Sequence, residues 1–127
     1  MSLEVKNINK KYGNYDALKN VTFSLKTGDI VGFLGPNGAG KSTLIKIMTG
    51  IMSPDKGTIY INNENIAENR NITKSNIGYI PEVPDGFNNL TVKEFLFFCG
   101  ELRSLKKDII ESELDLIDQQ FQIKDIF

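Results

Sequence analysis

Leu3, Val5 and Ile8 open a short apolar segment near the start of the chain, and Val21, Phe23 and Leu25 alternate strictly with polar residues. A period of two places the apolar side chains on one face of an extended strand. The pattern therefore predicts two half-buried antiparallel strands that form a small β layer.

Residues 30–34 show a different pattern, because they are apolar at consecutive positions. Such a run is typical of a strand that is covered on both faces in the middle of an α/β sheet. A glycine-rich segment follows, and the stretch from Lys41 to Met48 then contains no helix breaker and has an apolar side. These residues predict a buried strand that leads through a loop into a helix.

The middle of the chain has the pattern of two further strands. Ile59 and Ile61 alternate with polar neighbours after a segment rich in turn formers, and the Asn62-Asn63 pair that follows tolerates a tight turn. Residues 77–80 predict a second short strand, which should stop at Pro81 because proline has no amide hydrogen for a ladder.

The last part of the chain predicts a loop and two helices. The loop contains Pro84, Asp85 and Gly86, and after it Thr91 and Glu94 have the spacing of a capping box, which predicts a helix over residues 92–102. A second helix is indicated by apolar residues at helical spacing: Ile110, Leu114, Ile117 and Phe121.

The segment from Gly35 to Ser42 matches the pattern G-x-x-x-x-G-K-[ST], and it stands between a predicted buried strand and a predicted helix. Glycines allow the backbone to curl with its N–H groups inward at the helix N-terminus, where they form an anion-sized hollow. The amides expected to line this hollow are those of Gly38, Ala39, Gly40 and Lys41. We call residues 35–43 the phosphate loop.

Three side chains of the phosphate loop have the chemistry that a magnesium nucleotide needs. Lys41 supplies a compact positive charge for the β- and γ-phosphates, Ser42 offers a hydroxyl to Mg²⁺, and Thr43 can donate to the α-phosphate. The alternative is a glycine-rich turn that only joins a strand to a helix.

Composition narrows the classes of function. The chain has 127 residues, which is the size of one domain, and 40% of them are hydrophobic. With 15 basic and 16 acidic side chains it has no basic surplus for nucleic acid, and its apolar stretches are too short to span a bilayer. A lone cysteine, Cys99, fits a reducing compartment, and the lack of histidine excludes chemistry that needs an imidazole.

The sequence resembles the ATP-binding subunit of an ABC transporter. The resemblance rests on the amino-acid sequence of the segment from Gly35 to Thr43, including Asn37, and on Tyr12 in the segment Lys-Lys-Tyr-Gly. It rests also on residues 77–82 and 89–96, which are similar to the strand, Q-loop and start of the helical subdomain of that family. The implied fold is α/β: a P-loop NTPase-like ABC ATPase core with an N-terminal antiparallel β layer and the start of the helical subdomain, incomplete.

The resemblance implies ATP and Mg²⁺ as ligands and roles for two residues outside the phosphate loop. Tyr12 would stack on adenine, and its alternative is packing at the end of an edge strand. Glu82 stands where the family usually has glutamine, so it would be a Q-loop residue near Mg²⁺, or else a solvated carboxylate.

The resemblance also implies an organisation and partners. Residues 1–80 would be the β layer and P-loop core, and residues 81–127 the Q-loop and the beginning of the helical subdomain. The partners would be a transmembrane subunit or domain, received near the phenylalanine-rich segment after Glu82, and a second ATP-binding subunit. The chain would then be cytoplasmic and peripheral on the inner face of the membrane.

Several parts of the family pattern are missing from the sequence. It has no LSGGQ-type signature, no apolar strand ending in Asp-Glu and no switch histidine. The chain is therefore expected to bind nucleotide without appreciable hydrolysis on its own. The alternatives are a kinase of small metabolites, a soluble ABC protein that acts on ribosomes or DNA, and a non-catalytic remnant.

Overall fold

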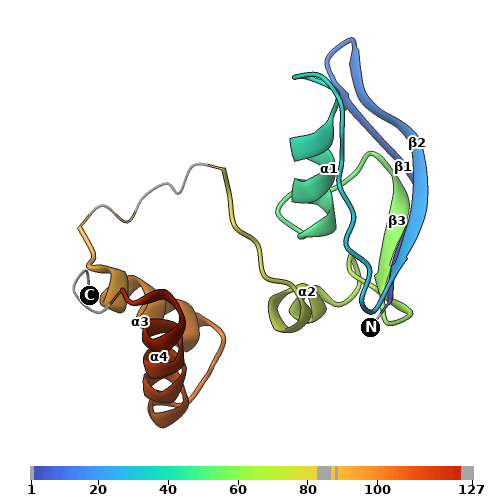
Figure 1. The fold of residues 1–127 in the computed structure, drawn as a ribbon. Helices are drawn as coiled ribbons and strands as arrows, with labels where there is room; N and C mark the ends of the chain where they lie inside the picture. The colour runs from blue at the N-terminus through green and yellow to red at the C-terminus, as the bar shows by residue number, and fades with distance from the viewer. Residues whose placement is uncertain (1, 83–86, 88, 124–127) are drawn as a thin grey trace. The chain divides into compact units, whose positions relative to one another are not determined.

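The computed structural model describes residues 2–82, 87 and 89–123 (Figure 1). The chain divides into two compact units, residues 1–79 and residues 80–127, and each is described by itself. The loop predicted around Pro84, Asp85 and Gly86 lies outside the described residues.

The first unit is built on an antiparallel sheet (Figure 1). Its strands are β1 (Ser2–Tyr12), β2 (Tyr15–Lys26), β3 (Lys56–Ile61) and β4 (Glu64–Asn65), in the order β2-β1-β3-β4. The pairing of β1 with β2 confirms the predicted β layer, and β3 confirms the strand predicted at Ile59 and Ile61. The Asn62-Asn63 pair joins β3 to β4 with φ of 52° and 66°, as expected of a tight turn.

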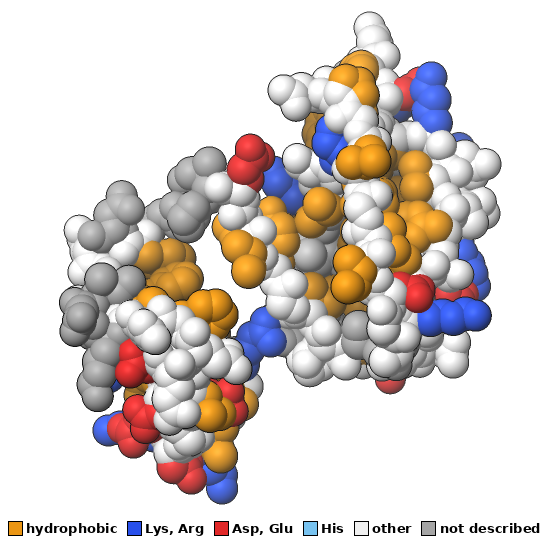
Figure 2. All heavy atoms as spheres, in the orientation of Figure 1, with side chains coloured by type: hydrophobic (Ala, Val, Ile, Leu, Met, Phe, Trp, Pro, Cys, Tyr) orange, Lys and Arg blue, Asp and Glu red, His pale blue; other side chains and the backbone are white. Residues whose placement is uncertain are grey.

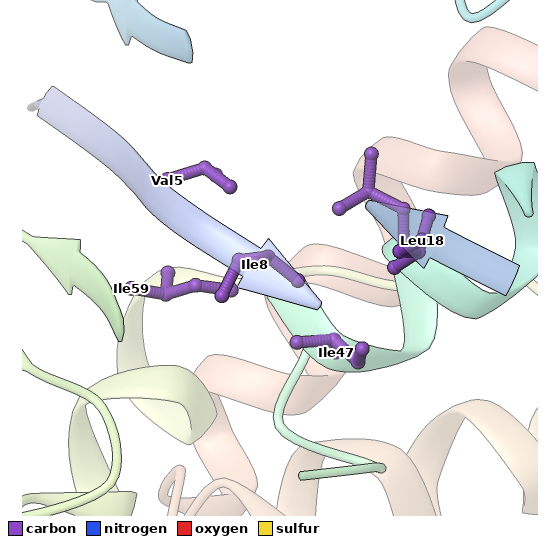
Figure 3. Close-up of a cluster of buried hydrophobic side chains, with 6 residues drawn as sticks. Val5, Ile8, Leu18, Ile47 and Ile59 are labelled. Atoms are coloured by element: carbon purple, nitrogen blue, oxygen red, sulfur yellow. The ribbon is translucent and has the colours of Figure 1, made fainter. Parts of the chain in front are cut away.

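Helix α1 (Lys41–Met48) lies against this sheet and has the bounds that the sequence predicts. Its apolar side supplies Leu44 and Ile47 to a buried cluster whose members touch across the layers. Figure 3 shows side chains of this cluster, which comprises Val5, Ile8, Leu18, Leu44, Ile47 and Ile59. Burial of this cluster fixes the start of α1, and hence the phosphate loop, to the sheet.

Two predicted strands are wrong. Residues 30–34 and 77–80 have no strand structure, and Ile30 and Leu34 are 100% and 97% exposed. A strand needs a neighbouring strand for its N–H and C=O groups, and no described strand forms a β ladder with either stretch. Hydrophobic side chains, drawn in orange in Figure 2, consequently lie open on the visible face of the first unit.

Helix α2 (Arg70–Asn76) is short and follows β4. The sequence pattern does not predict it. Ile72 is its buried hydrophobic residue.

The second unit contains helices α3 (Val92–Leu102) and α4 (Lys107–Phe121), which confirm both predicted helices. The Thr91 side chain accepts from the Glu94 amide and the Glu94 carboxylate accepts from the Thr91 amide, so the capping box is confirmed. The helices pack through Gly100 and Ile110, because a Cβ on Gly100 would lie 2.7 Å from Ile110 Cγ1.

Among the described residues, no helix combines the length and the apolar character needed to cross a membrane.

Candidate nucleotide-binding site

The phosphate loop enters α1 through Gly40, which has a left-handed backbone with φ of 88°. Gly40 is the N-cap of α1 and contributes no side-chain hydrogen bond to the first helical turn. Within the part of the chain that the structure describes, no side chain caps this helix start, as in the anion sites found at helix N-termini.

Gly40 also packs closely on β2. A Cβ at this position would lie 2.3 Å from the carbonyl oxygen of Ala17 and 2.8 Å from Leu18 Cδ2. Both the positive φ and the lack of space require glycine here. The close approach places the curl of the loop against the sheet.

The four backbone amides expected to line the hollow are not equivalent. The Ala39 amide donates to the Pro36 carbonyl at 3.1 Å, which closes a turn inside the loop. The amides of Gly38, Gly40 and Lys41 donate to no acceptor within the described part of the chain. Three N–H donors close together in one loop, next to a helix N-terminus, form a site that suits a phosphate group.

The ammonium of Lys41 lies over the beginning of the loop. Its Nζ donates to the Pro36 carbonyl at 2.8 Å and to the Gly35 carbonyl. No described carboxylate forms a salt bridge with Lys41. Neutral carbonyl groups therefore hold the ammonium over the start of the loop, and no acidic side chain among the described residues neutralises its charge for an anion that binds there.

The other polar side chains of the site are accessible. Asn37 and Ser42 are exposed and Thr43 is half-buried at the first turn of α1. No cluster of three or more acidic, histidine or cysteine side chains that could hold a metal occurs among the described residues. This donor set fits Mg²⁺ bound chiefly through phosphate and water oxygens, with the Ser42 hydroxyl as a protein ligand.

Glu82, the second predicted metal residue, is exposed and belongs to the second unit, whereas Ser42 belongs to the first. Its part in the site stays a prediction.

Tyr12 and Tyr15 lie opposite each other at the end of the β1–β2 hairpin. Tyr12 is 46% exposed and its hydroxyl lies 3.1 Å from Met52 Sδ, in the segment after α1. Tyr15 instead donates its hydroxyl to the Gly38 carbonyl of the phosphate loop. Tyr12 is a predicted site residue and Tyr15 is not, although the position of Tyr15 opposite Tyr12, beside a two-residue turn, is a usable signal.

The segment that carries Met52 is tied to the same hairpin by Asp55. Its carboxylate accepts from the Lys11 amide at 2.7 Å and from the Lys10 ammonium at 3.0 Å. These bonds, led by the one from the Lys11 amide, hold the pKa of Asp55 below its ordinary value. The segment that the Tyr12 hydroxyl contacts at Met52 is therefore connected to β1 by directed hydrogen bonds.

Comparisons with known proteins show which family this chain belongs to. A sequence profile of the ABC transporter family matches residues 18–126. The sulfate/thiosulfate import ATP-binding protein CysA of Mesostigma viride is 36% identical over 126 residues, which are 99% of this chain and 36% of that protein.

Solved structures give the same result for the fold. An ATP-binding subunit of an ABC transporter has a TM-score of 0.86 and 33% identity, over 99% of this chain and 52% of that chain. A dimeric, post-hydrolysis ATP-binding cassette, MJ0796, bound to ADP and Pi has a TM-score of 0.74 and 27% identity, over 87% of this chain and 53% of that one. These matches confirm the predicted ABC ATPase fold, and the chain spans about half or less of each relative. It belongs to the ABC transporter family, as the N-terminal part of an ATP-binding domain.

Proposed function

We propose that this chain binds the triphosphate of Mg-ATP through residues 35–43, as part of the energy-coupling subunit of an ABC transporter. The proposal rests on one observation: among the described residues, the amides of Gly38, Gly40 and Lys41 donate to no acceptor and the Lys41 ammonium has no acidic partner. Phosphate oxygens supply the acceptors that these donors lack.

Each polar group of the phosphate loop has a role in this proposal. The three free amides hold β-phosphate oxygens, and Lys41 moves from the Gly35 and Pro36 carbonyls toward the β- and γ-phosphates. Ser42 is a ligand of Mg²⁺ and Thr43 donates to the α-phosphate. Gly35 and Asn37 complete the curl that surrounds the triphosphate.

Tyr12 provides the surface for adenine. Its ring is accessible and its hydroxyl contacts only the weak acceptor Met52 Sδ among the described residues. Stacking of a base on an aromatic ring stabilises binding by about 1–3 kcal/mol. Replacement of Tyr12 by alanine should therefore weaken ATP binding and leave the binding of a triphosphate without a base unchanged.

The remaining assignments extend to the whole protein. Residues 1–80 form the β layer and P-loop core, and residues 81–127 carry the Q-loop, with Glu82 near Mg²⁺, and the beginning of the helical subdomain.

The transmembrane partner contacts the phenylalanine-rich surface of the second unit, where Phe87 lies 5.1 Å from Phe95 and 5.7 Å from Phe98, ring centre to ring centre. Phe87 is 45% exposed there. The relative MJ0796 forms a dimer, which supports a second ATP-binding subunit as the other partner. Such a chain is peripheral on the inner face of the membrane.

Binding and hydrolysis are separate in this proposal. Attack by water needs an orienting group and additional charge stabilisers, and the 127-residue chain offers neither in its sequence. The isolated chain should therefore bind Mg-ATP and release phosphate no faster than the buffer control.

Equilibrium titration with Mg-ATP tests the binding proposal. Lys41→Ala should weaken binding at least tenfold, because a charge-assisted bond to phosphate is worth about 1.5–3 kcal/mol. Lys46→Ala is the matched control, since Lys46 lies on α1 beyond the loop and is exposed. Equal affinities of the Lys41 variant and the parent chain would reject the proposal.

A further inference from the structure

One peptide group of the phosphate loop is held at both ends. The carbonyl of Gly38 accepts from the Tyr15 hydroxyl, and the N–H of the same peptide group, on Ala39, donates to the Pro36 carbonyl at 3.1 Å. The C=O and N–H of a planar trans peptide point in opposite directions. The two bonds therefore fix the rotation of this peptide about the chain.

That rotation controls the free amides. The Gly38–Ala39 peptide lies between the N–H groups of Gly38 and Gly40, which donate to no acceptor in the described part of the chain, and both glycines have positive φ, at 85° and 88°. Glycine at these angles has wide conformational freedom, so the local chain alone holds the curl weakly. The bond from Tyr15 supplies a restraint from outside the loop.

Strand pairing and nearby ion pairs hold the backbone at Tyr15 in place. Tyr15 is the first residue of β2 and pairs with Tyr12 across the hairpin turn. Its neighbour Asp16 forms ion pairs with Lys11 at 3.3 Å and with Lys19 at 3.2 Å. The tyrosine hydroxyl thus reaches the loop from a paired strand end.

We propose that Tyr15 is a positioning residue that holds the phosphate loop in the conformation that receives a triphosphate. It acts through the Gly38 carbonyl and touches no phosphate. Pre-ordering the loop before the ligand arrives reduces the entropic cost of binding. This inference rests on the proposed function, since it assigns a further residue to the same site.

Tyr15→Phe removes the hydroxyl and keeps the ring, so it tests the bond alone. Loss of one hydrogen bond of this kind should weaken the binding of Mg-tripolyphosphate and of Mg-ATP by the same factor, about twofold to tenfold. Tyr60→Phe is the matched control, because Tyr60 lies on β3 with its ring under the Lys6 ammonium and outside the loop. The control should bind both ligands as the parent chain does, and all three proteins should have the same melting temperature.

A second measurement does not require a ligand. Without the Tyr15 bond the Gly38–Ala39 peptide rotates more freely, so hydrogen exchange of the Ala39 amide should become faster in Tyr15→Phe and stay unchanged in Tyr60→Phe.

The outcomes separate this inference from the proposed function. If Tyr15→Phe binds tripolyphosphate as tightly as the control, or loses affinity for ATP alone, Tyr15 does not position the loop. If the parent chain binds neither ligand, the proposed function fails. Unchanged exchange at Ala39 would overturn the positioning role even then.

Discussion

Gly40 and Ala17 approach so closely that a Cβ on Gly40 would lie 2.3 Å from the Ala17 carbonyl oxygen. The contact joins the N-cap of α1 to β2. A glycine that a phosphate-loop motif requires for its curl therefore also sets how closely the helix N-terminus lies to the sheet.

Gly40→Ala should destabilise the first unit by about 1–3 kcal/mol, because it combines a backbone clash with a strained left-handed residue. It should also weaken Mg-ATP binding, since α1 must move away from β2. Gly28→Ala is the control for the strain alone, because Gly28 has φ of 92° and open space around its Cβ position. In denaturant unfolding, the free energy of unfolding of Gly40→Ala should be lower than that of Gly28→Ala. Equal stabilities of the two variants would contradict the close approach.

Gly100→Ala should destabilise the packing of α3 on α4, although alanine favours a helix over glycine. The added methyl group would lie 2.7 Å from Ile110 Cγ1 and 2.8 Å from Cδ1, and Ile110 is 3% exposed. We expect a loss of about 1–3 kcal/mol, as for other overpacked sites. The change Ile110→Val in the same chain removes one methyl group and should recover part of the loss in thermal unfolding. Additive losses in the double variant would argue against this contact.

The capping box of α3 predicts a pH dependence. Hydrogen bonds from the Thr91 amide, and then from its hydroxyl, lower the pKa of Glu94 from its ordinary 4.5. The stabilisation that the carboxylate supplies is therefore complete above pH 4.5 and is lost as the pH falls through the lower folded-state pKa.

Glu94→Gln measures this effect, because glutamine keeps the shape of the cap without the charge. The melting temperature of the parent chain should exceed that of the variant at neutral pH, and the two should converge in acid. A difference that stays constant with pH would show that the Glu94 charge does not stabilise α3.

The exposed side chains of residues 30–34 predict self-association of the 127-residue chain. Ile30 is 100% exposed within an uninterrupted apolar run. Ile30→Ser should lower the fraction of oligomer in light scattering, whereas Leu102→Ser, at a 65% exposed residue on α3, should change it less. A monodisperse parent monomer would contradict this prediction.

The sequence predicts elements well where the local signal is strong. The Thr91 and Glu94 pair fixes the start of α3, and the apolar side of residues 41–48 gives the bounds of α1. The signals at these elements are complete within a few residues, because caps and helical faces depend on near neighbours.

Local signals fail where an element depends on distant partners. Residues 30–34 have the composition of a buried strand, but a strand forms only beside another strand, and no described segment pairs with them. Helix α2 escapes notice for a different reason, since Ile72 is its one strongly apolar residue and gives no period.

The candidate site likewise combines features with a local sequence signal and features that depend on distant residues. The phosphate loop is predicted from its motif, whereas the bond from Tyr15 to Gly38 spans 23 positions of sequence and lies outside that motif. The pairing of Ala39 with Pro36 also distinguishes one amide from its neighbours in a way that the motif does not encode.

Amide resonances measured during titration with Mg-ATP report whether free amides of the phosphate loop receive a triphosphate. The resonances of Gly38, Gly40 and Lys41 should shift most, and the shift at Ala39, whose N–H is already bonded to Pro36, should be smaller. Saturable shifts confined to residues outside 35–43 would contradict this expectation.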